Sequence, residues 1–310
     1  MRTLAVLLLF VGLLTASAAS KKTVRKIKVA CVGNSITYGT GIKDRAHFSY
    51  PVQLQKMLGD NYEVGNFGKP GATLLNHGHR PYMRQDEFRQ AMAFKGDIAV
   101  IHLGINDTDP RNWPNYRDDF VRDYLSLMDS LRSANPKVRF ILACMTPIAD
   151  RHPRFISGTK CWHDEIQEAI KTVARVSGAE LIDFHAPLYP YPNLLPDAIH
   201  PNPEGAGILA RTVYGGITGD YGGLKLPCVY TDNMVLQRDT PLDIHGTANT
   251  GDRVVVSIAG QKAVAVANNR GEWSVKLKPL AVGTDYTLTI QAGKQKKVFS
   301  HVAAGEVWLC

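Results

Sequence analysis

Hydrophobic and polar positions follow two different patterns in the two parts of the chain. From residue 26 to about 219, short apolar runs alternate with segments whose apolar residues recur every three to four positions. Apolar runs of four to eight residues are typical of buried strands, and the longer spacing is typical of amphipathic helices. Alternating strands and helices predict a parallel sheet with helices on both of its faces.

The elements of this first part can be placed along the chain. The pattern predicts strands at 26–32, 62–66, 97–103, 138–145 and 180–183. It predicts helices at 51–58, 83–94, 116–133, 162–176 and 203–214. Ligands of such sheets bind beyond the carboxyl ends of the strands, so a site is expected among the residues that follow them.

After the glycine pair at 222–223, apolar and polar residues alternate in short runs instead. The runs predict strands at 253–258, 262–266, 273–277 and 286–290, with turns at 259–260, 268–271 and 292–293. Hairpins with Gly- and Asn-rich turns, and no helix signal between them, predict a small β-sandwich. We therefore expect an α/β domain at 20–219, a linker at 220–225 and an all-β sandwich at 226–310.

The N-terminus predicts export. Arg2 precedes an apolar run at 4–14, and small residues follow it. This pattern indicates a signal peptide at 1–19, cleaved after Ala18 or Ala19, which would place the mature protein in the periplasm or outside the cell. The apolar run is too short to span a bilayer comfortably and no comparable run follows it, so we expect no stable membrane anchor.

Composition and charge argue against several other functions. The formal net charge of +8 comes partly from short basic runs at 21–28 and 294–297, which lack interleaved aromatic residues, so no nucleic-acid partner is predicted. The five cysteines include no Cys-x-x-Cys pair, and most are expected to be unpaired buried thiols. His77 and His79 flank Gly78, but two histidines without an acidic cluster are a weak metal signal. We expect no metal and no other cofactor.

The best candidate for reactive chemistry is Ser35, in the stretch GNSITYG at 33–39 that follows the first predicted strand. A serine hydroxyl is a poor nucleophile until a neighbouring base takes its proton. Of the ten histidines, His200 is the best placed, because Pro201 biases it away from helical geometry just before the last helix. Asp197 can reach the same imidazole and fix its tautomer. Taken alone, Asp-x-x-His also fits an exposed polar turn.

Two further stretches can supply the hydrogen-bond donors that an acyl-transfer site needs where the oxyanion forms. Residues 66–73 (NFGKPGAT) form a glycine-rich loop after a predicted strand, and 103–108 (LGINDT) present the amide of Asn106. Each stretch is also compatible with an ordinary β-to-α turn. Trp113 is a candidate for a sugar-stacking residue at the rim of the site, or equally for core packing or a loop anchor.

Together the four stretches are more specific than any one of them. Their order, Gly-x-Ser, Asn-x-Gly-x-x-Gly, Gly-x-Asn-Asp and Asp-x-x-His, resembles the SGNH (GDSL) hydrolase superfamily over about residues 26–219. The resemblance implies a flavodoxin-like three-layer α/β/α fold, with Ser35 as nucleophile and His200 as general base, oriented by Asp197. It also implies an oxyanion hole formed by the backbone N–H groups of Ser35 and Gly71 and the side chain of Asn106.

Two positions qualify this resemblance. Asn34 stands where the superfamily usually has Asp, a position outside its triad, so the difference concerns local loop hydrogen bonding more than the reaction. Thr37 stands where the Gly-x-Ser-x-Gly elbow of the α/β-hydrolases requires glycine, and Ser35 follows the first strand instead of a middle one, so that fold is the less expected host.

The β-region carries a second resemblance. The strings DNMVLQR at 232–238 and GEVWLC at 305–310 resemble the N-terminal β-domain of sialate O-acetylesterase family proteins. In that family GEVWLC leads into a Ser-Gly-Gln-Ser-Asn segment with another catalytic serine. The resemblance implies that 226–310 is the first part of such a region, truncated before its catalytic domain, as in two-domain bacterial carbohydrate acetylesterases.

The leading hypothesis is a secreted serine esterase that removes O-acetyl groups from carbohydrate, either sialic acid or an acetylated polysaccharide such as xylan, through an acyl-serine intermediate. Acyl transfer rests on residues 33–200, and the sugar preference rests mainly on the β-region. A lipase, lysophospholipase or thioesterase of the same fold is the alternative within the class. A carbohydrate-binding protein with a catalytically inactive first domain is the alternative from another class.

Overall fold

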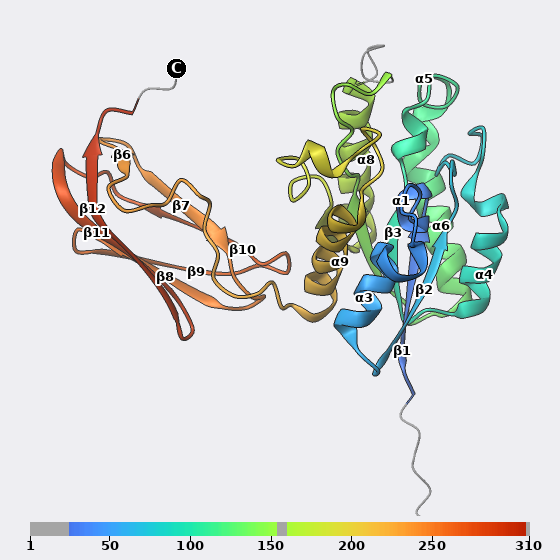
Figure 1. Ribbon diagram of the computed structural model, residues 1–310, viewed down its shortest axis with the longest axis horizontal. Coiled ribbons are helices and arrows are strands. Elements are labelled where there is room, and N and C mark those ends of the chain that lie inside the picture. The colour runs from blue at the N-terminus through green and yellow to red at the C-terminus, as the bar shows by residue number, and fades with distance from the viewer. Residues whose placement is uncertain (1–24, 154–159, 308–310) are drawn as a thin grey trace, which may run out of the picture.

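The computed structural model describes residues 25–153 and 160–307, which form an α/β region followed by a β-region (Figure 1). The predicted signal peptide at 1–19 lies outside the described residues, as do the last three residues of GEVWLC. The expected order of an α/β domain and a β-sheet region is confirmed.

A parallel five-stranded sheet forms the centre of the α/β region, in the order β2-β1-β3-β4-β5. Its strands are β1 Ile27–Gly33, β2 Tyr62–Gly68, β3 Ile98–His102, β4 Arg139–Cys144 and β5 Glu180–Asp183. Gly33 pairs with Gly68 on one side and with His102 on the other, so the carboxyl ends of β1, β2 and β3 lie level. The residues that follow these three strands are therefore brought together.

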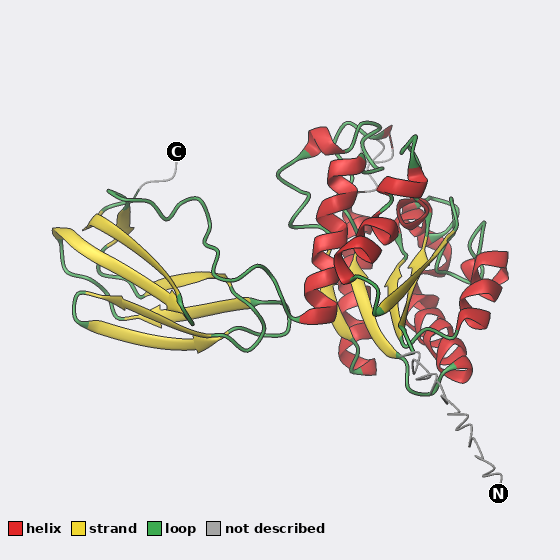
Figure 2. Cartoon of the chain, turned by 60° about the horizontal axis from the view of Figure 1, so that its bottom comes forward, coloured by secondary structure: helices red, strands yellow, loops and turns green. Residues whose placement is uncertain are grey.

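Helices cover both faces of this sheet. They are α1 Ser35–Tyr38, α2 Arg45–Phe48, α3 Tyr50–Leu58, α4 Asp86–Phe94, α5 Trp113–Tyr116, α6 Phe120–Ala134, α8 Lys160–Ser177 and α9 Pro203–Thr218. Short 3-10 helices are η1 Tyr82–Arg84, η2 Ile105–Thr108, η3 Arg117–Asp119 and η4 Pro192–Leu194. Helix α3 packs against α9, and α6 packs against α4 and α8, which places the two groups on opposite faces (Figures 1 and 2).

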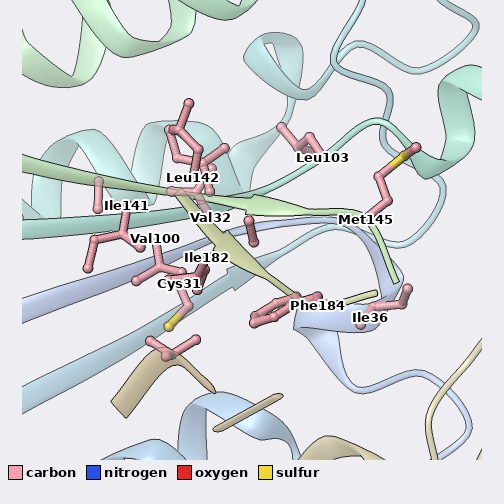
Figure 3. Close-up of a cluster of buried hydrophobic side chains, with 14 of the residues drawn as sticks. Cys31, Val32, Ile36, Val100, Leu103, Ile141, Leu142, Met145, Ile182 and Phe184 are labelled. Atoms are coloured by element: carbon pink, nitrogen blue, oxygen red, sulfur yellow. The ribbon is translucent and has the colours of Figure 1, made fainter. Parts of the chain in front are cut away.

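The sheet is buried on both faces because helices cover both of them. In β3 all five residues are buried, which explains why the strand reads as a continuous apolar run. Figure 3 shows core side chains on both sides of the sheet, with Cys31 and Leu142 pointing to opposite sides. Burial raises the pKa of the Cys31 thiol to about 12, so it packs as a small neutral side chain.

The β-region consists of two sheets that share one core, and their strand pairs are antiparallel except for the parallel pair of β6 with β12. Strands β7 Leu242–Thr247 and β10 Glu272–Leu277 form a two-stranded sheet. The second sheet has the order β6-β12-β11-β8-β9, with β6 Val235–Gln237, β8 Arg253–Ile258, β9 Gln261–Val266, β11 Gly283–Ala292 and β12 Gln295–Gly305. Alternate residues of β7 and β10 are buried against those of β8 and β11 in one hydrophobic cluster.

Some boundaries and one strand pairing differ from the sequence-based prediction. The turn at 268–271 does not close a hairpin, because β10 pairs with β7 while β9 pairs with β8. The helix predicted at 116–133 begins at Phe120, since α5 and η3 occupy the preceding residues. Helix α9 continues to Thr218 through Gly215 and Gly216. A Cβ at Gly216 would lie only 2.8 Å from Ile182 of β5, so glycine allows the end of the helix to pack closely against that strand.

The segment at 220–225, predicted as a linker, is hydrogen-bonded to the β-region. The side-chain oxygen of Asn249 accepts from the backbone N–H groups of Tyr221 and Gly223, each at 2.9 Å. Lys225 forms an isolated bridge with Thr247 of β7. The connection after α9 is therefore an ordered turn in the described structure.

Replacing Gly68 with alanine tests how closely α1 approaches the sheet. A Cβ at Gly68 would overlap the backbone nitrogen of Tyr38, which is main chain and cannot rotate away. We expect Gly68→Ala to lower the free energy of unfolding by about 1–3 kcal/mol or more, measured by urea denaturation. Gly305→Ala is the control, because its Cβ would meet only Val235 at an ordinary 3.5 Å. An unchanged midpoint for Gly68→Ala would contradict this packing.

Candidate active site

Ser35 is the first residue of α1 and is separated from the end of β1 by Asn34 alone. Asn34 caps this helix, since its side-chain oxygen accepts from the backbone N–H of Ile36 at 3.0 Å. Asn34 is fully buried, and its amide nitrogen has no hydrogen-bond partner within the described part of the chain. An aspartate at this position could form the same cap with one of its carboxylate oxygens. The Nδ2 group, which aspartate lacks, has no hydrogen-bond partner among the described residues.

The structure brings Ser35, His200 and Asp197 together in a row. Ser35 Oγ lies 2.9 Å from His200 Nε2, although the two residues are 165 positions apart. His200 Nδ1 lies 2.6 Å from Asp197 Oδ2. Because an ionised carboxylate only accepts, Nδ1 carries the proton and Nε2 accepts from the serine hydroxyl. This tautomer is the one that a general base needs.

The second oxygen of Asp197 fixes the loop that carries the imidazole. Asp197 Oδ1 accepts from the backbone N–H groups of His200 at 2.7 Å and Ile199 at 3.1 Å. Partial burial acts to raise the pKa of Asp197, but its hydrogen bonds with His200 and Ile199 outweigh burial and hold the pKa below its usual value. Ala198 adopts a left-handed φ of 70°, rare for a residue with a side chain. The loop is thus held in one geometry by the same carboxylate that orients His200.

Gly71 lies at the third position of a tight turn after β2. Ala72 N donates to Lys69 O at 3.1 Å, Pro70 occupies the second position, and Gly71 has a φ of 77°. These are the features of a type II turn, whose third position favours glycine because φ is positive. The turn joins the β1 end directly, since Lys69 N donates to Gly33 O at 2.9 Å.

Three hydrogen-bond donors are available at the ends of β1, β2 and β3. The backbone N–H groups of Ser35 and Gly71 donate to no acceptor among the described residues. Asn106, in η2, uses one amide hydrogen on Ala72 O at 2.9 Å and keeps the other. Such unpaired donors, fixed by backbone structure, can stabilise a negative oxygen without reorganising. The three candidate donors of an oxyanion hole therefore lie on the segments that follow β1, β2 and β3, which are neighbouring strands of the sheet.

Two buried carboxylates, to which the sequence analysis gave no role, fasten the loop beyond Gly71. Asp107 accepts from the backbone N–H groups of Leu74 and Leu75, both at 2.9 Å. Asp123 accepts from the N–H of Asn76 at 2.8 Å. Burial raises the pKa of Asp107 to about 7, against the opposing effect of these backbone donors. Asp107 stands in the Gly-x-Asn-Asp motif, but no local pattern marks either carboxylate as a loop anchor.

The other candidates from the sequence lie away from this arrangement. Trp113 is only 3% exposed and donates from Nε1 to Glu165 at 2.7 Å, so it is a buried anchor and not a rim residue. His77 Nδ1 lies 3.6 Å from Asp119, whereas His79 contacts Asn112. Residues 25–153 and 160–307 contain no group of three metal-binding side chains. Within these same ranges no helix is both long and apolar enough to cross a membrane.

A parallel α/β sheet that presents a hydrogen-bonded serine, histidine and carboxylate at its carboxyl edge has the arrangement of a serine hydrolase. The chain belongs to the GDSL-like lipase/acylhydrolase family, whose sequence profile matches residues 31–208. This match confirms the broader part of the resemblance found in the sequence.

Similar proteins agree with this assignment. An acetylxylan esterase from Xylanibacter ruminicola is 40% identical over 204 residues, which cover 60% of this chain and 42% of that protein. The chain thus matches less than half of the length of this relative. A solved structure of a candidate arylesterase from Agrobacterium tumefaciens shares the fold, with a TM-score of 0.51 at 17% identity over 62% of this chain and 98% of the other. A carbohydrate acetylesterase from Xanthomonas citri is 33% identical over 27% of this chain and 20% of its own, with a TM-score of 0.27, too low for comparing folds.

Stability should depend on pH through Asp107. Its pKa in the folded chain, about 7, lies above the ordinary aspartate value of 3.8 that applies to the unfolded chain. The folded chain therefore binds more protons between these values, and the contribution of Asp107 to stability falls as the pH rises from about 4 to about 7. We expect the stability of wild type relative to Asp107→Asn to be lower at pH 8 than at pH 5, by on the order of 2 kcal/mol.

Urea denaturation of both proteins at the two pH values measures this difference. The hydrogen bond that Asp107→Asn loses costs a similar amount at either pH, so only the titration of Asp107 changes the difference between the proteins. The same pH dependence in wild type and variant would contradict the prediction.

Proposed function

We propose that the protein is a secreted serine esterase that removes O-acetyl groups from carbohydrate. The observation that carries the proposal is the row of hydrogen-bonded groups, 2.9 Å from Ser35 to His200 and 2.6 Å from His200 to Asp197. A serine with this partner is activated for attack on an ester carbonyl. Membership of an acylhydrolase family agrees with this chemistry.

The reaction then has two halves. Ser35 Oγ attacks the ester carbon while its proton passes to His200 Nε2, and the carbonyl oxygen becomes an oxyanion facing the N–H groups of Ser35 and Gly71 and the amide of Asn106. Collapse of this intermediate releases the sugar hydroxyl, which takes the proton from His200, and leaves an acetyl group on Ser35. A water molecule, deprotonated by His200, repeats the attack and releases acetate.

The choice of acetylated carbohydrate has weaker support than the choice of reaction. It rests on the similarity to an acetylxylan esterase and on the resemblance of 232–238 and 305–310 to sialate O-acetylesterase family proteins. We favour an acetylated xylan-type polysaccharide over sialic acid, because the matched relative is a xylan esterase. Export is proposed from the pattern at 1–19, and a mature N-terminus at Ala19 or Ser20 would be its signature.

Replacing Ser35 tests the reaction itself. We expect Ser35→Ala to lower the rate of acetate release from acetylated xylan by about a thousandfold or more, because the nucleophile is lost. Ser130→Ala is a matched control, since the hydroxyl of Ser130 bonds only to Ser126 O on an exposed part of α6. A fluorophosphonate should label wild type and Ser130→Ala but not Ser35→Ala. Full activity in Ser35→Ala would contradict the assignment of Ser35 as the nucleophile. A folded wild-type protein that neither reacts with the fluorophosphonate nor releases acetate would favour a carbohydrate-binding protein instead of an enzyme.

Substrate class is tested by comparing esters on wild type. We expect p-nitrophenyl acetate to be hydrolysed faster than the octanoate ester, and acetylated xylan to be deacetylated faster than O-acetylated sialic acid. A preference for octanoate would favour a lipase or thioesterase, and a preference for the sialic acid would replace the proposed glycan while keeping the reaction.

A further inference from the structure

A cavity of about 400 Å³ lies at the carboxyl ends of β4 and β5, beside the loop that carries Asp197 and His200. This volume falls within the range of roughly 300–1,000 Å³ that small-molecule sites occupy. Its walls come from the segment after β4, from the start of α8 and from the segment after β5. Leu195 lines the cavity and stands two residues before Asp197.

Hydrogen bonds join the cavity wall to the catalytic loop. Ala149, in the wall, donates from its backbone N–H to the carbonyl of Ala198 at 2.8 Å. The guanidinium of Arg151, also in the wall, donates to the carbonyl of Leu195. The cavity wall and the loop that carries Asp197 and His200 are therefore joined by two direct hydrogen bonds.

The cavity presents an aromatic surface with unused polar groups. The rings of His185 and Tyr189 stack, with centroids 5.2 Å apart and planes at 23°. Tyr189 is 64% exposed. Neither the ring nitrogens of His185 nor the hydroxyl of Tyr189 form a hydrogen bond within the described part of the chain, although both residues line the cavity. An exposed aromatic face with a polar tip can contact the C–H face of a sugar ring and bond its hydroxyls.

Among the described residues that line the cavity, the charges balance. They include two acidic side chains, Asp150 and Asp164, and two basic ones, Arg151 and Lys160, of which Asp150 and Lys160 form an ion pair at 2.8 Å. Burial also lowers the pKa of His185, which disfavours a positive charge on that ring. Such a wall suits an uncharged ligand better than an anion.

We propose that this cavity is a glycan subsite, in which an uncharged sugar next to the acetylated residue stacks on Tyr189 and bonds His185 through its hydroxyls. The inference rests on the proposed function and refines it, because it names a polysaccharide of neutral sugars as the substrate. The acetyl ester would lie at Ser35, while the neighbouring sugar of the same chain occupies the cavity.

The experiment compares a substrate that carries this neighbouring sugar with an acetate ester that contains no sugar. For Tyr189→Ala we expect KM for acetylated xylo-oligosaccharides to rise roughly three- to tenfold with kcat unchanged, and kcat/KM for p-nitrophenyl acetate to stay the same. Tyr189→Phe keeps the ring and should restore most of the affinity. Tyr191→Ala is the matched control, because Tyr191 is also exposed, at 50%, but does not line the cavity.

Several outcomes would overturn the subsite. Equal losses on both substrates would show that Tyr189 only supports the catalytic loop, and unchanged kinetics on both would show that no sugar binds there. A selective loss on p-nitrophenyl octanoate would assign the cavity to an acyl chain. Failure of the proposed function is distinguishable from all of these, because wild type itself would then release no acetate from the oligosaccharide.

Discussion

The candidate site depends on one geometrical constraint, the level alignment of the carboxyl ends of β1, β2 and β3. Gly33 pairs with both Gly68 and His102, so the residues after the three strands enter the same space. Gly68 leaves room for the backbone of α1, which places the Ser35 N–H at the start of a helix beside the turn that holds Gly71. A parallel sheet creates this edge by its topology, and the glycines allow three chain segments to approach one another there.

Backbone geometry alone does not hold the loops in place, since three carboxylates also bond to their backbone N–H groups. Asp197 uses one oxygen for the imidazole and the other for the backbone of its own loop. Asp107 and Asp123 together accept from three successive N–H groups at 74–76. The burial of Asp107 raises its pKa to about 7, so its charge is retained at a cost in stability. That cost is consistent with a site whose donors must be fixed before the substrate arrives.

Much of this organisation could be predicted from the sequence, for identifiable physical reasons. Strands buried on both faces appear as continuous apolar runs, and Ser35, Asn106 and His200 stand at strand ends or before a helix, where turn residues mark the boundary. The pairing of β10 with β7 could not be predicted, because a turn at 268–271 has the same composition whether it closes a hairpin or crosses between sheets. The burial of Trp113 could not be predicted either, because its sequence context is compatible with a rim position and with a core position. The hydrogen bond to Glu165 that anchors it becomes visible only in the structure.

Asn34 shows how a departure from a family pattern can keep the local helix cap intact. Its side-chain oxygen caps α1 as a carboxylate oxygen would, so the N–H of Ser35 keeps its position at the helix start. Its unpaired buried amide costs about 1–3 kcal/mol. The loss is therefore one of stability, while the cap that holds the Ser35 N–H at the start of α1 is kept.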